Sequence, residues 1–523
     1  MRKLFIGLMS AFISISLTAQ DLTEKAEIQW SEEVKNSRKQ EVEQTIVANS
    51  DFFIVKAGRD ITVEKFDGNM NLAGTIEVSG KFAEGEAEFV KLLVVGDELF
   101  VFLKDDSEIE KSDKLAFLKI DIKSFRVTAS PKVFWSTKER LPDKYYRGSF
   151  EVLFSEDESK IAILNNKYGM QVDYKLFDLE MNLQHEKEIV LELEDYDIEP
   201  IMKWTSFYNP IHFVPRATGS GDLFIQLISE NKKEPGLESR SLGEKPKMDR
   251  LLLYKYSISE GTEKYLNLDL ENRRVLISDY AFASSDNLLV GGIFSNNITS
   301  DEDVTTDGAF VFSVDPNSMR ITGSSADEFA SGVIAKSMVR KGLLGAESRY
   351  RPEIEMELRG LNASTNGFQF VAEQYFDSES DTKYFMKTMD IITVSASSEG
   401  EIQWISMVDK KQELESRSPD FHEAYTYPVF KNGQIHLFYN VAGEFFYSEE
   451  EQKGMGRSTL KTNFTAWTIV DESGNVSSEL LSNNDETGQL LVPGFSEASR
   501  DGGHLFMYTL DGNKQKVGKV TFK

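Results

Sequence analysis

Gly96-Asp-Glu-Leu-Phe-Val-Phe102 is a short turn that leads directly into an apolar run, and the chain repeats this arrangement along its length. Seven further copies place Gly, Asp, Asn or Ser before a run dense in Phe, Leu, Ile and Val. They are Asp51–Val55, Ser159–Leu164, Gly221–Ile225, Asp286–Val290, Asn366–Val371, Asn432–Leu437 and Gly502–Met507. The copies recur about every 64 residues, which is typical of a repeat fold. Turns alternating with short apolar runs predict antiparallel blades and therefore a β-propeller.

Each repeat contains a second apolar run, which we assign as strand C, following the first run as strand B. Leu115–Asp121 and Phe464–Asp471 are examples, rich in the β-branched and aromatic residues that favour strands and ending at a residue that favours a turn. Strand A precedes the B turn, as Phe89–Val95 does, and strand D follows strand C, as Leu72–Val78 does. Each repeat therefore predicts one four-stranded blade.

The last repeat ends just after its strand C, so its strand D must come from elsewhere. Glu27–Trp30 repeats the sequence of Glu401–Trp404, which lies where strand D of the sixth repeat is expected. We therefore expect the N-terminal segment to supply the outer strand of the last blade and to close the ring. The prediction is an all-β protein with a single eight-bladed propeller over residues 21–523, and a seven-bladed ring is the alternative.

Residues 327–344 depart from the strand pattern. Phe329, Val333 and Met338 recur at helical spacing, with acidic residues at the start of the segment and basic residues towards its end. We expect one helical insertion here, between the fifth and sixth blades, packed over the ring.

The first twenty residues have the layout of a secretory signal peptide. Arg2 and Lys3 precede the apolar stretch Leu4–Leu17, and Thr18-Ala-Gln20 offers small residues for cleavage. The apolar stretch is shorter than the roughly 18 residues expected of a membrane span. We expect residues 1–20 to be removed and the mature protein to be periplasmic or extracellular.

The composition excludes several classes of chemistry. With 59 basic and 86 acidic residues the formal net charge is −27, which disfavours nucleic acid and anionic lipid as partners. Cysteine is absent, so thiol nucleophiles and thiolate metal sites are excluded. The five histidines show no metal-ligand spacing, and we expect neither a metal nor a cofactor. Asp301–Gly308 has oxygen ligands for calcium but lacks the twelfth-position Glu of an EF-hand loop, so a solvated acidic loop is the favoured interpretation.

Five long insertions fall between strands B and C. In a propeller the B–C and D–A connections share one face, which we call the B–C face, and the A–B and C–D turns share the other, the A–B face. The insertions are Lys104–Lys114, Ser229–Arg250, Ser295–Gly308, Asp377–Lys383 and Val441–Asn463. Because loops that lengthen on one face of a repeat array usually mark a binding surface, the B–C face is the expected site.

The D–A connections on this same face are rich in aromatic residues and arginine. Such side chains supply large contact areas with polar ends, and gathered arginines in an acidic protein favour a carboxylate or another anion. The alternative is that the aromatic residues fill the core between inner strands. The candidate ligand-binding residues are Tyr145, Tyr146, Arg147, Trp204, Tyr208, Arg349, Tyr350, Arg351, His422, Tyr425 and Tyr427.

Two resemblances follow from these motifs. The leader ending in Thr18-Ala-Gln20 and repeats such as Asn366–Tyr375 resemble exported propeller-like proteins of Bacteroidota-type bacteria, which mostly lack an assigned activity. This resemblance covers most of the chain through generic strand patterns. Gly400–Trp404 resembles the Gly…Trp ends of eight-bladed quinoprotein repeats, but only Trp30 and Trp404 match, so no quinone cofactor is expected.

These observations favour an exported, non-catalytic binding or scaffold propeller that recognises a protein, peptide or glycan on its B–C face. We expect it to be monomeric, without a membrane span. The alternative is a propeller enzyme, a hydrolase or lyase acting on polymer fragments, with His422, Glu423, Tyr425 and Arg351 as its polar groups. No catalytic residue is assigned.

Overall fold

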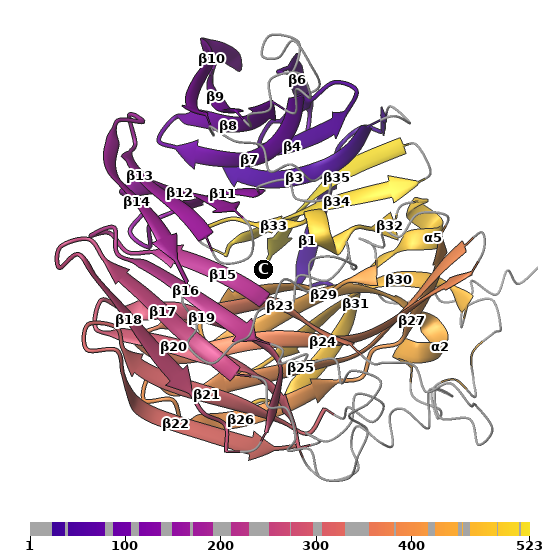
Figure 1. The fold of residues 1–523 in the computed structure, drawn as a ribbon. Helices are drawn as coiled ribbons and strands as arrows, with labels where there is room; N and C mark the ends of the chain where they lie inside the picture. Colours follow the sequence, from indigo (N-terminus) through magenta and orange to yellow (C-terminus); the bar gives the residue numbers. More distant parts are fainter. Residues whose placement is uncertain are drawn as a thin grey trace, which may run out of the picture.

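The computed structural model describes most of the chain, and the ring is built from these residues. They are 23–36, 40–78, 87–105, 114–136, 149–167, 171–191, 211–229, 250–271, 273–296, 306–329, 355–380, 383–416, 424–447, 452, 455, 461–488, 490–500, 502–511 and 514–523. They form eight antiparallel sheets arranged as blades around a central axis (Figure 1). The protein is an eight-bladed β-propeller, as predicted, and the seven-bladed alternative is wrong.

Blades 1 to 5 each consist of four consecutive strands, which run in the order A, B, C, D. Blade 1 contains β3 (Gln40–Ala48), β4 (Asp51–Gly58), β5 (Thr62–Phe66) and β6 (Leu72–Glu77). Blade 2 contains β7 (Ala87–Val95), β8 (Glu98–Asp105), β9 (Lys114–Asp121) and β10 (Arg126–Ser136). Blade 3 contains β11 (Ser149–Phe154), β12 (Lys160–Lys167), β13 (Gln171–Asp178) and β14 (Leu183–Val190). Blade 4 contains β15 (Ile211–Ala217), β16 (Leu223–Ser229), β17 (Arg250–Ser257) and β18 (Thr262–Leu268). Blade 5 contains β19 (Arg274–Ser284), β20 (Asn287–Ser295), β21 (Gly308–Asp315) and β22 (Arg320–Glu328).

Blades 6 to 8 vary this plan. Blade 6 contains β23 (Glu355–Ser364), β24 (Gly367–Ser380), β25 (Lys383–Ala396) and β26 (Ile402–Val408), and β27 (Gln412–Ser416) also pairs with β25. Blade 7 contains β28 (Tyr427–Lys431), β29 (Gln434–Ala442), β30 (Asn463–Val470) and β31 (Val476–Asn483), with the short helices α2 (Gly443–Phe446) and α5 (Asn484–Thr487) at strand ends. Blade 8 contains β32 (Leu490–Leu491), the 3-10 turn η4 (Pro493–Phe495), β33 (Glu497–Ala498), β34 (His504–Asp511) and β35 (Lys514–Phe522).

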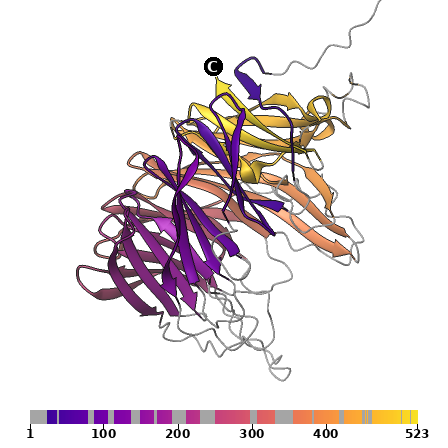
Figure 2. The same ribbon diagram turned by 90° about the horizontal axis from the view of Figure 1, so that it is seen from above.

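The N-terminal segment closes the ring. Strand β1 (Ala26–Trp30) pairs antiparallel with β35, placing Ile28 opposite Val520, and β2 (Val34–Lys35) pairs with the start of β35. Figure 2 shows indigo β1 beside the yellow strands of blade 8. The predicted closure is confirmed, because the repeated sequence forms the outer strand both here and in β26 of blade 6.

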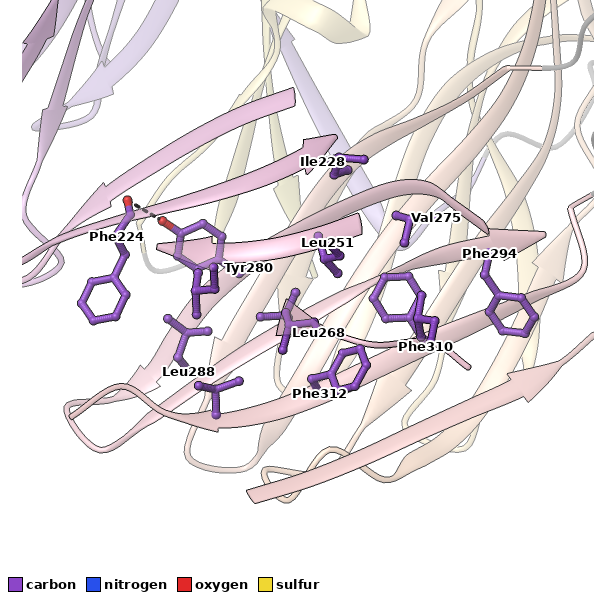
Figure 3. Packing of buried hydrophobic residues seen from close by; sticks show 14 of the residues in the cluster. Phe224, Ile228, Leu251, Leu268, Val275, Tyr280, Leu288, Phe294, Phe310 and Phe312 are labelled. Carbon is purple, nitrogen blue, oxygen red and sulfur yellow. Dashed lines mark hydrogen bonds between the residues drawn. The ribbon is translucent and has the colours of Figure 1, made fainter. Parts of the chain in front are cut away.

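The hydrophobic core is divided among the blade interfaces. Each of eight large clusters of buried residues in the described ranges lies between two successive blades, including blades 8 and 1. Between blades 4 and 5, Leu251 and Leu268 pack against Phe310, and the Tyr280 hydroxyl donates to the Phe224 carbonyl at 2.9 Å (Figure 3). Because each blade buries its faces only against its neighbours, closing the ring completes the last interface.

The predicted polar turns after strand C are formed by a recurring contact. The carboxylates of Asp67 and Asp471 accept hydrogen bonds from the backbone N–H of Asn71 and Asn475, each at 2.9 Å. The residue before each asparagine has a left-handed backbone, with φ of 62° at Met70 and 82° at Gly474. An aspartate side chain therefore fixes the same tight turn in blades far apart in the sequence.

Two local predictions are corrected by the strand pairing. Asp327 and Glu328, expected to begin a helix, are the last residues of β22 and lie opposite Ala309 and Gly308. Their backbone groups continue the hydrogen-bond ladder with the buried strand β21. This pairing outweighs the helical spacing of the side chains. Residues 330–344 of the expected helix lie outside the described residues.

No helix formed by the part of the chain that is described is long and apolar enough to cross a membrane.

The insertion expected at Asp377–Lys383 is a continuation of strands rather than a loop. Strands β24 and β25 pair as far as Ser380 opposite Lys383, and β27 adds a third strand with Gln412 opposite Thr388. This extended hairpin lengthens blade 6 on the B–C face. Three of the other insertions, Lys104–Lys114, Ser229–Arg250 and Ser295–Gly308, fall largely outside the described residues. The fourth, Val441–Asn463, is described in part and contains α2.

Candidate functional site

Two of the eleven candidate residues can be placed. Tyr425 and Tyr427 lie where the chain passes from blade 6 into β28 of blade 7. The other nine candidates lie outside the described residues: Tyr145, Tyr146, Arg147, Trp204, Tyr208, Arg349, Tyr350, Arg351 and His422. Glu423 also lies outside them. The candidate site is therefore built outward from the two tyrosines.

Tyr425 stacks on an arginine of the inner strand of blade 6. The guanidinium carbon of Arg359 lies 3.7 Å from the centroid of the Tyr425 ring. Arg359 stands at a bulge in β23, where the pairing with β24 shifts between Leu358 and Gly360. Bulges re-aim a side chain, and Arg359 reaches Tyr425 in the segment that leads into blade 7. The guanidinium also contacts Glu357 at 2.8 Å through Nη1.

A fully buried glutamate organises the residues around Arg359. Glu373 Oε2 accepts a hydrogen bond from Arg359 Nε at 2.7 Å and one from the Thr426 backbone N–H at 3.1 Å. Its Oε1 accepts from Lys410 Nζ at 2.5 Å and from the Thr426 hydroxyl at 2.9 Å. Lys410 Nζ also donates to the Ala424 carbonyl at 2.7 Å. We call Arg359, Glu373, Lys410 and Thr426 the blade 6 ion cluster.

The electrostatics of this cluster are balanced. Burial raises the pKa of Glu373, but the charges of Lys410 and Arg359 outweigh burial, so the pKa lies below its usual value. Glu373 therefore stays ionised and ties the backbone of residues 424–426 to blade 6. The members of the cluster come from β23, β24, the link between β26 and β27, and the segment before β28, so no sequence motif joins them.

One hydrogen-bond donor of the cluster, Arg359 Nη2, is unused. The Arg359 side chain is only 7% exposed, and its buried Nη2 atom has no hydrogen-bond partner among the described residues. Beside the cluster, Tyr375, Tyr384, Leu414 and Tyr425 pack on Met386 and Ala424 under the extended hairpin. The B–C face thus combines an unused guanidinium donor with aromatic side chains.

Tyr427 faces a different neighbourhood near the ring axis. Its hydroxyl accepts a hydrogen bond from the Ala498 backbone N–H at 2.9 Å and is also hydrogen-bonded to Glu497. Burial raises the pKa of Tyr427. Tyr427 therefore joins the inner strands of blades 7 and 8, which matches the alternative that these aromatic residues fill the space between inner strands.

Glu497 belongs to a second charged group, which we call the axial cluster: Thr45, Lys91, Glu151 and Glu497, from the inner strands of blades 1, 2, 3 and 8. Burial raises the pKa of Glu151 and of Glu497 to about 7, although Lys91 lowers each of them. Hydrogen bonds from Tyr427 and Thr45 also favour ionised Glu497. Two carboxyl groups therefore share one lysine.

A cavity of about 500 Å³ opens on the A–B face, and we call it the axial pocket. It is lined by the A–B turns of blades 8, 1, 2 and 3. Arg500 of blade 8 and Glu158 of blade 3 both line it and form an ion pair of 2.9 Å. No sequence pattern indicated this pocket, because the turns that form it are short and far apart in the chain.

Comparisons with known proteins give no indication of an activity. No protein-family model matches the chain, and no curated protein matches its sequence. Among solved structures it is similar to polysaccharide lyase Uly1, with 9% identity over 86% of this chain and 91% of that one, at a TM-score of 0.40. It is also similar to the β-propeller domain of Nup133 from Vanderwaltozyma polyspora, with 11% identity over 83% of this chain and 99% of that one (TM-score 0.36). A protein of unknown function from Bacteroides caccae covers 56% of this chain and 83% of its own length, at 8% identity (TM-score 0.28).

Proposed function

We propose that this chain is an exported, non-catalytic binding propeller that recognises a protein, peptide or glycan on its B–C face. The observation that carries the proposal is the unused, buried Nη2 donor of Arg359 beside the aromatic residues of blade 6. A buried donor without an acceptor costs roughly 1–3 kcal/mol, and an oxygen atom of a bound ligand removes that cost. Guanidinium groups favour carboxylates in particular.

The surroundings of Arg359 support a preorganised contact. Its Nε and Nη1 atoms are held by Glu373 and Glu357, and its flat face is covered by Tyr425. A side chain fixed in this way loses little conformational entropy when a ligand binds. Tyrosine and arginine are also the residue types that dominate the binding energy of recognition surfaces.

The described residues favour binding over proton transfer. The four hydrogen bonds that Glu373 accepts all come from protein groups, so its carboxylate is committed to holding the cluster together. Burial and the charge of Glu357 raise the pKa of Tyr425, although Arg359 opposes them. A phenol with a raised pKa is a weaker candidate for a general base near neutral pH. Arg359, Glu373 and Tyr425 therefore suit the positioning of a ligand.

The test compares a B–C face variant with a matched control. Trp204→Ala, Tyr350→Ala and His422→Ala are combined in one chain, and Tyr265→Ala removes a tyrosine exposed on the outer strand β18. Each protein is used for capture from the native cell envelope and on glycan and peptide arrays. We expect the triple variant to lose the wild-type partner at least about tenfold, the usual consequence of removing interface anchors. The control should retain it.

A second variant tests the arginine itself. Arg359→Lys keeps a positive charge for Glu373 but removes the Nη2 donor, so binding should weaken while the fold persists. If the triple variant and Arg359→Lys both bind like wild type, the B–C face is not the binding surface. If the wild-type protein instead cleaves a polymer substrate and the triple variant does not, the protein is an enzyme and the proposal is wrong.

A further inference from the structure

A groove at the perimeter of the ring lies between the outer strands of blades 5 and 6, and we call it the perimeter groove. Its lining combines carboxylates with aromatic and aliphatic side chains from β22, the residue after it, and β26: Asp327, Glu328, Phe329, Ile402, Ile405 and Met407. Figure 1 shows β22 and β26 beside each other at the outer edge of the ring. The groove has a volume of about 500 Å³, within the usual range for ligand sites, roughly 300–1,000 Å³.

The two strands that border the groove are held together by a serine. Ser325 Oγ donates to the Gly400 carbonyl at 2.7 Å and accepts a hydrogen bond from the Ile402 backbone N–H at 2.9 Å. Because side chains alternate along a strand, Asp327 projects to the same side of β22 as Ser325, towards blade 6. Phe329 packs with Ile402 in the cluster between these two blades. The apolar walls of the groove are therefore formed before any ligand binds.

The charge of the groove is not balanced. Its lining contains two exposed carboxylates and, among the described residues, no lysine, arginine or histidine. Glu328 Oε1 accepts a hydrogen bond from the neutral Asn296 side chain at 3.1 Å. In the axial pocket, by contrast, Arg500 is paired with Glu158. The perimeter groove therefore favours a ligand that brings a positive charge together with apolar side chains.

Strand β26 also offers an open sheet edge beside the groove. It pairs with β25 and is the last strand of the main path through its sheet, so its other edge carries no neighbouring strand in the described part of the chain. Such an edge can accept an extended peptide as an additional strand. Every blade ends in an outer strand of this kind, but here the groove adds apolar side chains and carboxylates to the edge.

We propose that the perimeter groove binds an extended basic peptide segment of a partner protein, which adds as a strand to β26. Alternate apolar side chains of the peptide pack on Ile405 and Met407, and a lysine or arginine on the same face of the peptide pairs with Asp327. A glycan is a poorer match, because the side-chain donors of Trp404 and Ser406 are already used. They donate to the carbonyls of Glu472 and Gly474, at 2.9 and 2.5 Å.

The test measures the fluorescence anisotropy of labelled peptides titrated with the full chain. The probe is Gly-Ser-Val-Thr-Val-Thr-Lys-Ser amide, in which the two valines and the lysine share one face of a strand. One comparison peptide replaces the lysine with glutamate, and another has the same composition in an order that breaks the alternation. The lysine peptide should bind at least about fivefold more tightly than either. Its affinity should fall severalfold between about 0.05 and 0.5 M salt.

Two further peptides test the addition of a strand. Each is N-methylated at one of the two sets of alternate residues, because an added strand uses only one set of its N–H groups for pairing. Methylation of that set should abolish binding, whereas methylation of the other set should leave most of it.

A charge reversal separates binding from misfolding. Asp327→Lys combined with Glu328→Lys should reverse the preference, so that the glutamate peptide binds more tightly than the lysine peptide. A misfolded variant would lose both peptides instead. The control combines Glu77→Lys and Glu188→Lys, both exposed on outer strands, and should keep the wild-type preference.

The inference is wrong if wild type binds neither peptide or both equally, if the charge reversal does not change the preference, or if the two methylated peptides bind alike. A wild-type dimer that the charge reversal dissociates would assign the groove to a second copy of the chain. Binding that appears only when Lys336, Arg340 and Lys341 are replaced would assign it to the chain itself. Either result overturns the inference.

This binding goes beyond the proposed function and does not depend on it. The triple variant of the B–C face should bind the lysine peptide as wild type does. Loss of every partner on the B–C face would therefore contradict only the proposed function, and failure of the peptide titrations would contradict only the perimeter groove.

Discussion

The blade 6 ion cluster and the axial cluster contain the same types of residue but differ in how their buried carboxyl groups are paired with cations. Glu373 shares its two oxygens among Arg359, Lys410 and Thr426, and its pKa lies below its usual value. Glu151 and Glu497 share a single lysine, and their pKa values rise to about 7. Buried charges that are fully paired hold the chain together. Those left partly unpaired bear the cost of burial, which raises their pKa values.

The largest expected effect breaks the balanced cluster. Glu373→Gln removes the carboxylate that pairs with Arg359 and with the fully buried Lys410. We expect the free energy of unfolding to fall by about 3–5 kcal/mol, the usual cost of removing one partner of a buried ion pair. Urea unfolding measures this change. The control Glu151→Gln should cost at most about 1 kcal/mol, since its carboxyl is not fully paired. Equal losses in the two variants would contradict the comparison.

The second prediction concerns pH and sharpens the same contrast. Glu151 and Glu497 keep their protons up to about pH 7 in the folded chain but lose them near pH 4.5 when unfolded. Because the folded state binds more protons in this interval, the free energy of unfolding falls as pH rises from about 4.5 to about 7. Each carboxyl should contribute on the order of 1–2 kcal/mol to this fall after allowing for partial exposure. Glu373 has the opposite sign: its stabilisation is present above pH 4.5 and is lost as pH falls.

Urea unfolding of wild type and of Glu151→Gln with Glu497→Gln, measured from about pH 5 to pH 8, checks this prediction. The double variant should show a flatter dependence of the free energy of unfolding on pH, because two of the groups that titrate on unfolding are gone. Parallel profiles would mean that the axial carboxyl groups titrate as they do in the unfolded chain. Lys91, Tyr427 and Thr45 are the described groups that act on this pair, and none is altered in the variant.

The two clusters also show what could be predicted from the sequence and what could not. Turn signals before Asp51–Val55 and its seven copies indicated the blades, because hairpin geometry depends on residues that are adjacent in the chain. The repeated Glu27–Trp30 correctly indicated closure onto β35. Glu373 meets Lys410, and Glu151 is influenced by Lys91, only after distant strands come together. Spacing along the sequence carries no information on such contacts.

The candidate site was predicted unevenly for the same reason. Tyr425 was expected to contribute contact area, and its stacking on Arg359 depends on a bulge in β23 that no residue pattern indicates. The axial pocket was not predicted, because loop length favours the B–C face, whereas this cavity is formed by turns such as Asn49-Ser50 that are as short as ordinary hairpin turns. Asp327 and Glu328 were expected in a helix, yet pairing with Gly308 and Ala309 extends β22 through them.

The smallest expected effect on stability concerns the rim of the axial pocket. Arg500 and Glu158 form an exposed ion pair between blades 8 and 3, and such pairs contribute little because water screens them. Arg500→Ala should therefore change the free energy of unfolding by no more than about 0.5 kcal/mol. Urea unfolding of the variant and of wild type measures this change. A large loss of stability would show that the pair joins the two blades structurally.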